Sequence, residues 1–286
     1  MPTWNRAKYI GETIATIRNQ TYQNWELIIV DDGSDDNTKN VVSEIKDGRI
    51  QFYEAGRIGI GGAIKNIGLK KAQGEFIAFI DSDDLWAPTK LEQQLLALQQ
   101  YPDAGFCLAG GYNFKEPGQP LDYFYKQKKG IHYGNIFISC FKSEVAGFTQ
   151  ALFFKRQCIT TTGGFKEEKS FSDVDFIITL SRHFNAVIIY DPLVYRRIHS
   201  NNYIHSTWEK SYYEGIELIE SNKKELPKLI SRNALFSIYI NFGEKYFFYK
   251  DYKKALQKFL IAFKLKPFRF AASKKMMKAI VYYLIK

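Results

Sequence analysis

The first hundred residues alternate between helix-like and strand-like segments, and this alternation leaves few folds open to the chain. Ile10, Ile14 and Ile17 recur at the spacing of one helical face, and the run WELIIV after them is typical of a buried strand. The order continues with TKNVVSEI, IQFYEA, GGAIKNIGLKKAQ and EFIAFI, and the helix-like PTKLEQQLLALQQ ends it with Pro88 in its first turn. Strands separated by helices predict an α/β fold in which a mostly parallel sheet is flanked by helices.

Two acidic clusters follow two of these predicted strands. DDGSDD occupies residues 31–36 and DSDD residues 81–84. Like charges about 4 Å apart repel by roughly 4 kcal/mol at an effective dielectric near 20, so a cation is expected among them. Ligands of parallel sheets bind beyond the carboxyl ends of the strands, and Mg²⁺ or Mn²⁺ takes oxygen ligands that it often shares with phosphates. Either cluster alone also fits a turn that caps the next helix, but the pair favours one common crevice.

The later segments predict a long loop, a return to the sheet and a helical end. Residues 112–148 are aromatic, rich in lysine and punctuated by glycine, which is typical of an excursion that carries specificity. TQALFFKR resumes as a strand, SDVDFIITLSRHF as a helix and AVIIY as a last strand. The chain after His205 is predicted to be helical, with breaks near Pro227 and Pro267. We therefore expect a domain over residues 1–204 and a helical extension over residues 205–286.

The net charge of +10 lies entirely in the predicted extension. Residues 205–286 hold 17 Lys/Arg and 7 Asp/Glu, whereas residues 1–204 hold 23 of each. A basic tail interleaved with aromatic residues indicates contact with an anionic membrane surface, and a helical cap with solvated charges is the alternative. The neutral remainder gives no support for a nucleic acid partner.

The cysteines and the hydropathy favour a cytoplasmic protein. Cys107, Cys140 and Cys158 have no metal-ligand spacing, and their odd number argues against a disulfide framework. The sequence shows no leader pattern and no run of 18 apolar residues.

Four stretches together resemble glycosyltransferase family 2. These are PTWNRAKYIGETIATIRNQTYQNWELIIVDDGSDDNT, KNIGLKKAQGEFIAFIDSDDLWAP, GGF and SDVDF, which occur in the family's order and spacing over roughly residues 2–200. The resemblance implies a GT-A, Rossmann-like fold, a nucleotide-sugar donor (most simply a UDP-sugar), a Mn²⁺ or Mg²⁺ ion and inversion at the anomeric carbon.

The resemblance also assigns residues to the donor. Trp4 stands near the uracil, Asp32 accepts from the ring N–H of the base, and Asp83 binds the metal. Arg57 or Lys65 meets the base or the diphosphate, although the family usually has arginine where Lys65 stands. The further candidates for donor binding are Pro2, Thr3, Asp81 at the ribose, Ser82, and Asp84 at the ribose or behind the metal.

Two later stretches complete the implied site. Asp173 of SDVDF takes the position of the catalytic base, and a helix cap is the alternative, because Ser172 or Asp173 could equally begin a helix. Asp175 is expected to be structural. In PLVYRRIHSNN, Arg197 and His199 are candidates to approach the diphosphate or its metal, and a surface turn with solvated charges is the alternative.

The sequence departs from the family at its start. Family members usually carry an apolar strand ahead of the segment that begins here at Pro2, so we expect either that the reading frame starts upstream or that the sheet lacks its first strand.

The predicted function is a metal-dependent inverting transferase that moves a sugar to a glycan or lipid-linked acceptor in cell-surface polysaccharide synthesis. The alternatives are a non-catalytic nucleotide-binding protein on the same fold and a nucleotidyltransferase, for which the sequence lacks the Gly-rich basic loop.

Overall fold

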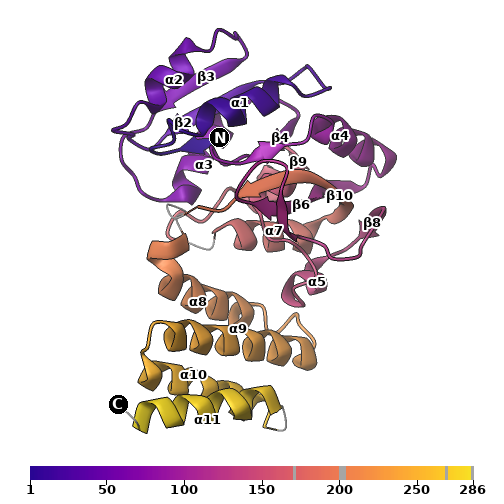
Figure 1. Ribbon diagram of the computed structural model, residues 1–286. Coiled ribbons are helices and arrows are strands. Elements are labelled where there is room, and N and C mark those ends of the chain that lie inside the picture. Colours follow the sequence, from indigo (N-terminus) through magenta and orange to yellow (C-terminus); the bar gives the residue numbers. More distant parts are fainter. Residues whose placement is uncertain (170–171, 200–203, 268–269, 285–286) are drawn as a thin grey trace. The chain divides into compact units, whose positions relative to one another are not determined.

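The computed structural model describes residues 1–169, 172–199, 204–267 and 270–284. The chain divides into two compact units, one of residues 1–140 with 144–202 and the other of residues 203–286 with 141–143 (Figure 1). The domain boundary predicted after residue 204 adjoins residues 200–203, which lie outside the described residues.

The first unit begins with a small parallel sheet. Its strand order is β1-β2-β3, and each strand pairs in parallel with its neighbour. Helices connect the strands, and the isoleucines of the first helix that were predicted to share a face are all buried. The elements are β1 (Pro2–Thr3), α1 (Ile10–Arg18), β2 (Leu27–Asp31), α2 (Thr38–Glu44), β3 (Ile50–Glu54) and α3 (Gly61–Lys71).

Strand β1 lies at the very start of the chain. Pro2 and Thr3 form β1, in register with Val30 and Asp31 of β2. The backbone N–H of Val30 donates to the Met1 carbonyl at 2.9 Å, and that of Asp32 donates to the Thr3 carbonyl at the same distance. β1 is therefore a parallel neighbour of β2, and it is two residues long.

A larger sheet in the order β4-β9-β6-β10-β5 forms the rest of the first unit, with β7 paired to β6 and β8 paired to β10. Among the described residues, only the β6–β10 pair of this sheet is parallel, and β9 runs antiparallel to both β4 and β6. The expected mostly parallel sheet is thus parallel at its beginning and mixed here. The elements are β4 (Phe76–Ala78), β5 (Leu85–Trp86), α4 (Lys90–Gln100), β6 (Ala104–Phe114), β7 (Pro120–Tyr123), β8 (Ile131–Gly134), α5 (Phe137–Phe141), η1 (Thr149–Ala151), β9 (Leu152–Lys155), α6 (Cys158–Thr162), α7 (Ser172–His183) and β10 (Asn185–Arg197).

Strand β6 lies at the centre of this sheet and was not predicted from the sequence. Glycine is depleted in strands, and Gly105, Gly110 and Gly111 interrupt the pattern. The structure explains two of them. A Cβ atom at Gly110 would lie 2.3 Å from the Tyr190 carbonyl oxygen, and one at Gly111 would lie 2.0 Å from that of Val194. These glycines allow β6 to approach the irregular part of β10 closely.

The second unit is helical, as predicted from the sequence. It contains α8 (Ile204–Ser221), α9 (Lys228–Phe248), α10 (Tyr252–Leu265) and α11 (Phe270–Leu284). Phe242 is fully buried, with its ring stacked 4.7 Å from that of Tyr212 and 4.9 Å from that of Tyr246. Burial of aromatic side chains therefore contributes to the stability of this unit.

We predict that Phe242→Ala lowers the free energy of unfolding of the helical unit by about 3–5 kcal/mol, because it leaves a cavity in an aromatic core. Phe248→Ala is the matched control on the same helix, since Phe248 is 75% exposed and its loss should cost less than about 0.5 kcal/mol. Denaturant melts followed by circular dichroism measure both values, and equal losses would contradict this account of the core.

Candidate active site

Asp32 organises one end of the candidate site. It follows β2 directly and is buried. Its Oδ1 accepts the backbone N–H groups of Ile58 at 2.6 Å and Gly59 at 3.0 Å, and the Arg57 guanidinium pairs with Oδ2. The same guanidinium lies 3.9 Å from the ring centroid of Trp4, which is 41% exposed. Trp4, Arg57 and Asp32 thus form one stacked and hydrogen-bonded group.

A glycine makes this approach possible. Gly33 has a φ of +72°, and a Cβ atom there would lie 2.8 Å from the backbone nitrogen of Arg57. A side chain at this position would push the loop of residues 57–59 away from the end of β2.

Other carboxylates of the first cluster hold the loop rather than face a ligand. Asp31 accepts the backbone N–H of Ser34 at 2.9 Å, and Asp36 accepts those of Thr38 at 2.9 Å and Ala7 at 3.0 Å. Burial acts to raise the pKa of Asp36, but the hydrogen bonds from Thr38 and Ala7 outweigh it and lower that pKa. The turn and capping role weighed for this cluster therefore applies to part of it.

The second cluster presents Asp83 to two partners. Its Oδ2 lies 2.9 Å from Arg6 Nε and 2.9 Å from His199 Nε2. The His199 ring stacks on that of Tyr9 with centroids 5.1 Å apart. One carboxylate oxygen thus joins three segments that are distant in the sequence.

Asp84 is buried more deeply than Asp83. Its Oδ1 accepts the backbone N–H of Arg197 at 2.8 Å, while its Oδ2 is buried and has no hydrogen-bond partner among the described residues. Burial, followed by the nearby charges of Asp83 and Asp81, raises the pKa of Asp84 well above its ordinary value. An unpaired buried carboxyl oxygen is costly, and such groups gather at functional sites.

Arg197 fastens the last strand to this cluster. Its Nε donates to the Asp83 carbonyl at 2.9 Å, and its Nη2 contacts Glu12 Oε2 at 2.5 Å. The buried guanidinium thus supports the backbone that carries the acidic cluster, which differs from the free surface turn considered for this segment.

Asp81 and Asp173 share the cation Lys65. Lys65 Nζ lies 2.5 Å from Asp173 Oδ1 and 3.0 Å from Thr149 Oγ1, and the Thr149 hydroxyl donates to Asp173 Oδ2 at 2.8 Å. Burial acts to lower the pKa of Lys65, but the carboxylates of Asp173 and Asp81 raise it. Burial also raises the pKa of Asp81, whose Oδ2 accepts from the amide of Gln150. The side chain of Asp173 remains 31% exposed at the start of α7, where an acceptor could reach it.

Asp175 lies two residues further along α7 and is structural in its contacts. It is buried, and its Oδ1 lies 2.9 Å from Lys166 Nζ.

The residues around Asp83 fit a divalent cation whose remaining ligands would come from the substrate. Among the described residues, no group of three or more His, Cys, Asp and Glu side chains is arranged to hold a metal ion. Magnesium is usually held by one or two carboxylates together with phosphate oxygens. Asp83 and His199 meet at one point, and the Arg6 guanidinium shows that positive charge is stable there.

The structure therefore brings most of the predicted residues to the carboxyl ends of β2 and β4. Pro2 and Thr3 belong to β1, and Ser82 is buried between Asp81 and Asp83. Sequence reasoning missed Arg6, Thr149 and Gln150, because each stands in a stretch whose pattern indicated only structure. The only feature of the sequence that could have indicated these three residues is a polar side chain beside the end of a predicted strand.

These features define the class of the protein. A strand–helix series with acidic clusters at the strand ends, followed by helices, is the architecture of GT-A glycosyltransferases. The structure of S. aureus TarS 1-349 in complex with UDP-GlcNAc matches with a TM-score of 0.69 at 17% identity, over 97% of this chain and 87% of that one. The mannosyltransferase PcManGT from Pyrobaculum calidifontis, in complex with GDP-Man and Mn2+, matches with a TM-score of 0.61 at 18% identity, over 100% and 84% of the two chains.

Residues 1–158 match Glycosyl transferase family 2, and the chain belongs to this family. The putative glycosyltransferase EpsH of Bacillus subtilis is 30% identical over 77% of this chain and 65% of its own length. The UDP-Glc:alpha-D-GlcNAc-diphosphoundecaprenol beta-1,3-glucosyltransferase WfgD of Escherichia coli is 44% identical over 33% of this chain and 38% of its own. This chain thus spans less than two thirds of the length of either relative.

Proposed function

We propose that the protein transfers a sugar from a UDP-sugar to a glycan or lipid-linked acceptor in cell-surface polysaccharide synthesis, with inversion and with the help of a divalent cation. The observation that carries the proposal is the proximity of two charge clusters. Asp83 meets His199, and Asp173 meets Lys65, while Asp81 lies within electrostatic reach of both clusters. A nucleotide-sugar has a diphosphate for the first cluster and a reacting carbon for the second.

The donor would lie along the strand ends. The exposed ring of Trp4 offers a stacking surface for a uracil, and Asp32 offers an acceptor for its ring N–H. Arg57 would exchange part of its contact with Asp32 for the base or the diphosphate. The ribose would lie next to Asp81, Ser82 and Asp84. A TarS structure contains UDP-GlcNAc whereas the PcManGT structure contains GDP-Man, and the WfgD name specifies UDP-Glc, so a UDP-sugar is the better supported choice.

The cation would be held by Asp83 and His199, and when bound it would neutralise the charge that develops on the leaving diphosphate. Arg6 lies at the same carboxylate oxygen and would turn toward the phosphates as the cation enters. Arg197 would keep the backbone of Asp83 in place throughout.

Asp173 would accept the proton of the acceptor hydroxyl as that oxygen attacks the anomeric carbon. Lys65 and Thr149 orient its carboxylate, and the positive charge of Lys65 favours the ionised form that a base requires.

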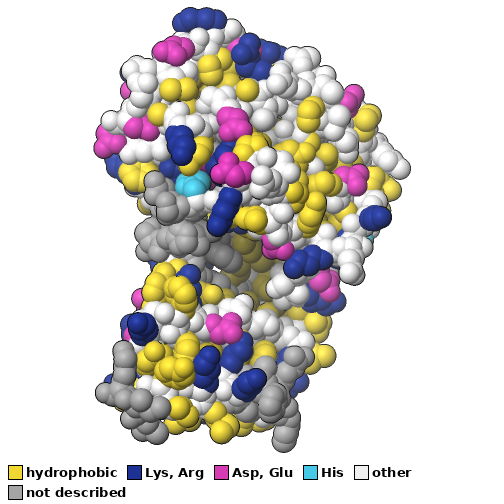
Figure 2. Space-filling model, viewed as in Figure 1, with side chains coloured by type: hydrophobic (Ala, Val, Ile, Leu, Met, Phe, Trp, Pro, Cys, Tyr) yellow, Lys and Arg dark blue, Asp and Glu magenta, His cyan; other side chains and the backbone are white. Residues whose placement is uncertain are grey.

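The acceptor is proposed from the relatives and from the helical unit. The name of WfgD specifies a lipid-linked acceptor, and another relative is a putative teichuronic acid biosynthesis glycosyltransferase of Bacillus subtilis. None of the described helices is both long and apolar enough to cross a bilayer. On α11, Lys274, Met277, Lys278 and Val281 recur at the spacing of one helical face, and all four are exposed. Figure 2 shows Lys and Arg side chains among hydrophobic ones over these C-terminal helices, which is the composition of a helix that lies on an anionic membrane.

We predict that Asp83→Ala removes the dependence of UDP affinity on Mn²⁺, because it deletes the carboxylate around which the cation would assemble. Isothermal titration of UDP with and without Mn²⁺ measures this. Asp122→Ala, at an exposed carboxylate of β7, is the control and should leave the dependence unchanged. An undiminished Mn²⁺ effect in Asp83→Ala would contradict the metal assignment.

We predict that Asp173→Asn lowers kcat by about 10²- to 10⁴-fold and leaves the affinity for UDP within a few-fold, because only the proton acceptor is lost. The matched control is Asp175→Asn on the same helix, which should lower stability and leave kcat nearly unchanged. Release of UDP from a panel of UDP-sugars with an acceptor measures turnover. Normal kcat in Asp173→Asn would return this residue to a capping role, and UDP binding without turnover in the unaltered chain would favour a non-catalytic protein.

We predict that the full chain co-sediments with vesicles that contain anionic lipid, and that replacing both Lys274 and Lys278 by Gln weakens this binding by about 10-fold or more. Each basic residue near such a surface contributes about 1 kcal/mol. A chain with Lys46 and Lys70 replaced by Gln, which has the same net charge, should bind as the unaltered chain does. Equal losses in both variants, or no binding by the full chain, would remove the membrane from the proposal.

A further inference from the structure

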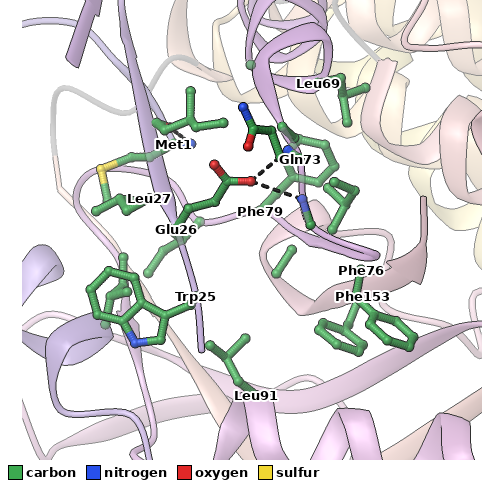
Figure 3. A pocket seen from close by; sticks show the side chains of 18 of the residues that line it. Met1, Trp25, Glu26, Leu27, Leu69, Gln73, Phe76, Phe79, Leu91 and Phe153 are labelled. Atoms are coloured by element: carbon green, nitrogen blue, oxygen red, sulfur yellow. Dashed lines mark hydrogen bonds between the residues drawn. The ribbon is translucent and has the colours of Figure 1, made fainter. Parts of the chain in front are cut away.

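The cavity between β2 and β4 does not suit an anionic ligand. It has a volume of about 560 Å³ and a mostly apolar lining, and Glu26 Oε1 in its wall accepts the N–H groups of Gln73 at 2.7 Å and Gly74 at 3.0 Å (Figure 3). Among the described residues that line it, Lys65 is the only lysine or arginine, and its Nζ is bound to Asp173. An anionic ligand needs cations from elsewhere in the unit, and the carboxyl ends of the strands carry them.

Arg196 differs from the other cations beside the acidic clusters, because no carboxylate of the described residues lies within ion-pair distance of it. Its Nη1 lies 3.5 Å from Asn113 Oδ1, at the long limit of a hydrogen bond. Burial raises the pKa of Asp81 and of Asp84, whereas the charge of Arg196 acts from a longer distance to lower both pKa values. The cations that are paired with carboxylates are Arg6, Arg57, Lys65, Arg197 and His199.

An aromatic ring supports the Arg196 guanidinium. Its Cζ lies 4.5 Å from the centroid of the Phe148 ring, and that ring contacts the Phe124 ring with centroids 5.0 Å apart. Phe124 is held in turn, because its N–H donates to the Gly111 carbonyl at 2.8 Å. A Cβ atom at Gly111 would lie 2.7 Å from the Phe124 ring, so a side chain there would displace this support. An arginine stacked on an aromatic ring keeps the N–H groups along its edge available to an oxyanion.

Phe148 links this group to the proposed base. It directly precedes η1, where the Thr149 hydroxyl donates to Asp173 Oδ2 at 2.8 Å. In an inverting transfer the attacking hydroxyl meets the base on the face of the sugar opposite the leaving group. Arg196 and Phe148 are both partly exposed, so a ligand can reach them. Arg196 therefore lies where an acceptor bound at Asp173 would extend.

We propose that Arg196 binds an anionic group of the acceptor, a phosphate or a carboxylate, and so selects acceptors that carry one. This inference rests on the proposed function, since it names the class of acceptor for the same site. The segment of residues 112–148, whose composition indicates specificity, holds the guanidinium through Asn113 and Phe148, and Phe124 supports the ring. The diphosphate of a lipid-linked acceptor and the carboxylate of an acidic sugar present the same chemistry to this group.

The test measures the binding of acceptor probes to the full chain in the presence of saturating UDP and Mn²⁺, which occupy the donor site. The probes are an alkyl sugar diphosphate, a methyl glucuronide and a neutral methyl glucoside, each followed by ligand-observed NMR. We expect the unaltered chain to bind one anionic probe about 10-fold or more tightly than the neutral probe, and Arg196→Gln to lose this preference. The anionic probe that binds identifies the group as a phosphate or a carboxylate.

Two further variants separate the role of Arg196 from a general loss of charge or structure. Arg156→Gln, at an exposed arginine directly after β9, is the matched control and should keep the preference. Phe148→Leu leaves the guanidinium in place and removes its aromatic support, so it should weaken binding of the anionic probe by about 3-fold or more. This second variant also tests the site in the case that Arg196→Gln does not fold.

Equal binding of the anionic and neutral probes by the unaltered chain would overturn the proposal. A loss of UDP affinity in Arg196→Gln as large as the loss for the anionic probe would also overturn it, since this residue would then bind the diphosphate of the donor. Failure of the proposed function gives a different result. The unaltered chain would then transfer no sugar from any UDP-sugar, while the preference for an anionic probe and its loss in Arg196→Gln would still support the anion site.

Discussion

The site depends on one carboxylate, that of Asp83, and on the charges gathered around it. Arg6 and His199 lie 77 and 116 residues away in sequence and reach the same oxygen atom. Together with Arg197, which binds the Asp83 carbonyl, they hold the start of α1 and the end of β10 against the end of β4. Four carboxylates at residues 31, 32, 83 and 84 are buried, and such groups are stable only when cations and N–H groups surround them. Keeping these charges together therefore costs the fold stability. The resulting charge distribution is the one that we propose binds a diphosphate and its cation.

The acidic residues of the site fall into two groups according to their hydrogen-bond partners. Asp31 and Asp36 accept hydrogen bonds from their own loop, and Asp175 is paired with Lys166. Within the part of the chain that the structure describes, one oxygen of Asp84 has no partner, and Asp83 is held by the side chains of Arg6 and His199. Asp31, Asp36 and Asp175 therefore stabilise the structure around the site. Asp83 and Asp84 are the carboxylates that we propose contact a ligand.

Much of this was predictable from the sequence. The acidic clusters could be placed because apolar runs ended directly before residues 31 and 81, and the final helices because apolar positions recurred with helical spacing between prolines. Strand β6 could not be predicted, since its glycines are required by close contacts with β10 that no local pattern records. Arg6, Thr149 and Gln150 were missed for a similar reason, because their contacts with Asp83, Lys65 and Asp81 join residues 69–84 positions apart in the sequence. Lys65 was predicted, as an alternative to Arg57, to meet the base or the diphosphate of the donor, and the contacts of its Nζ with Asp173 and Thr149 could not be predicted from the sequence.

The central claim is that both acidic clusters face one nucleotide-sugar, and a crystal structure with UDP and Mn²⁺ tests it most directly. Diffraction data collected at the manganese absorption edge locate the ion by its anomalous signal. Our account predicts one peak at the Asp83 carboxylate next to His199, with the diphosphate beside it and the uracil between Trp4 and Asp32. A manganese peak away from Asp83, or a uracil bound elsewhere than at Asp32, would contradict it.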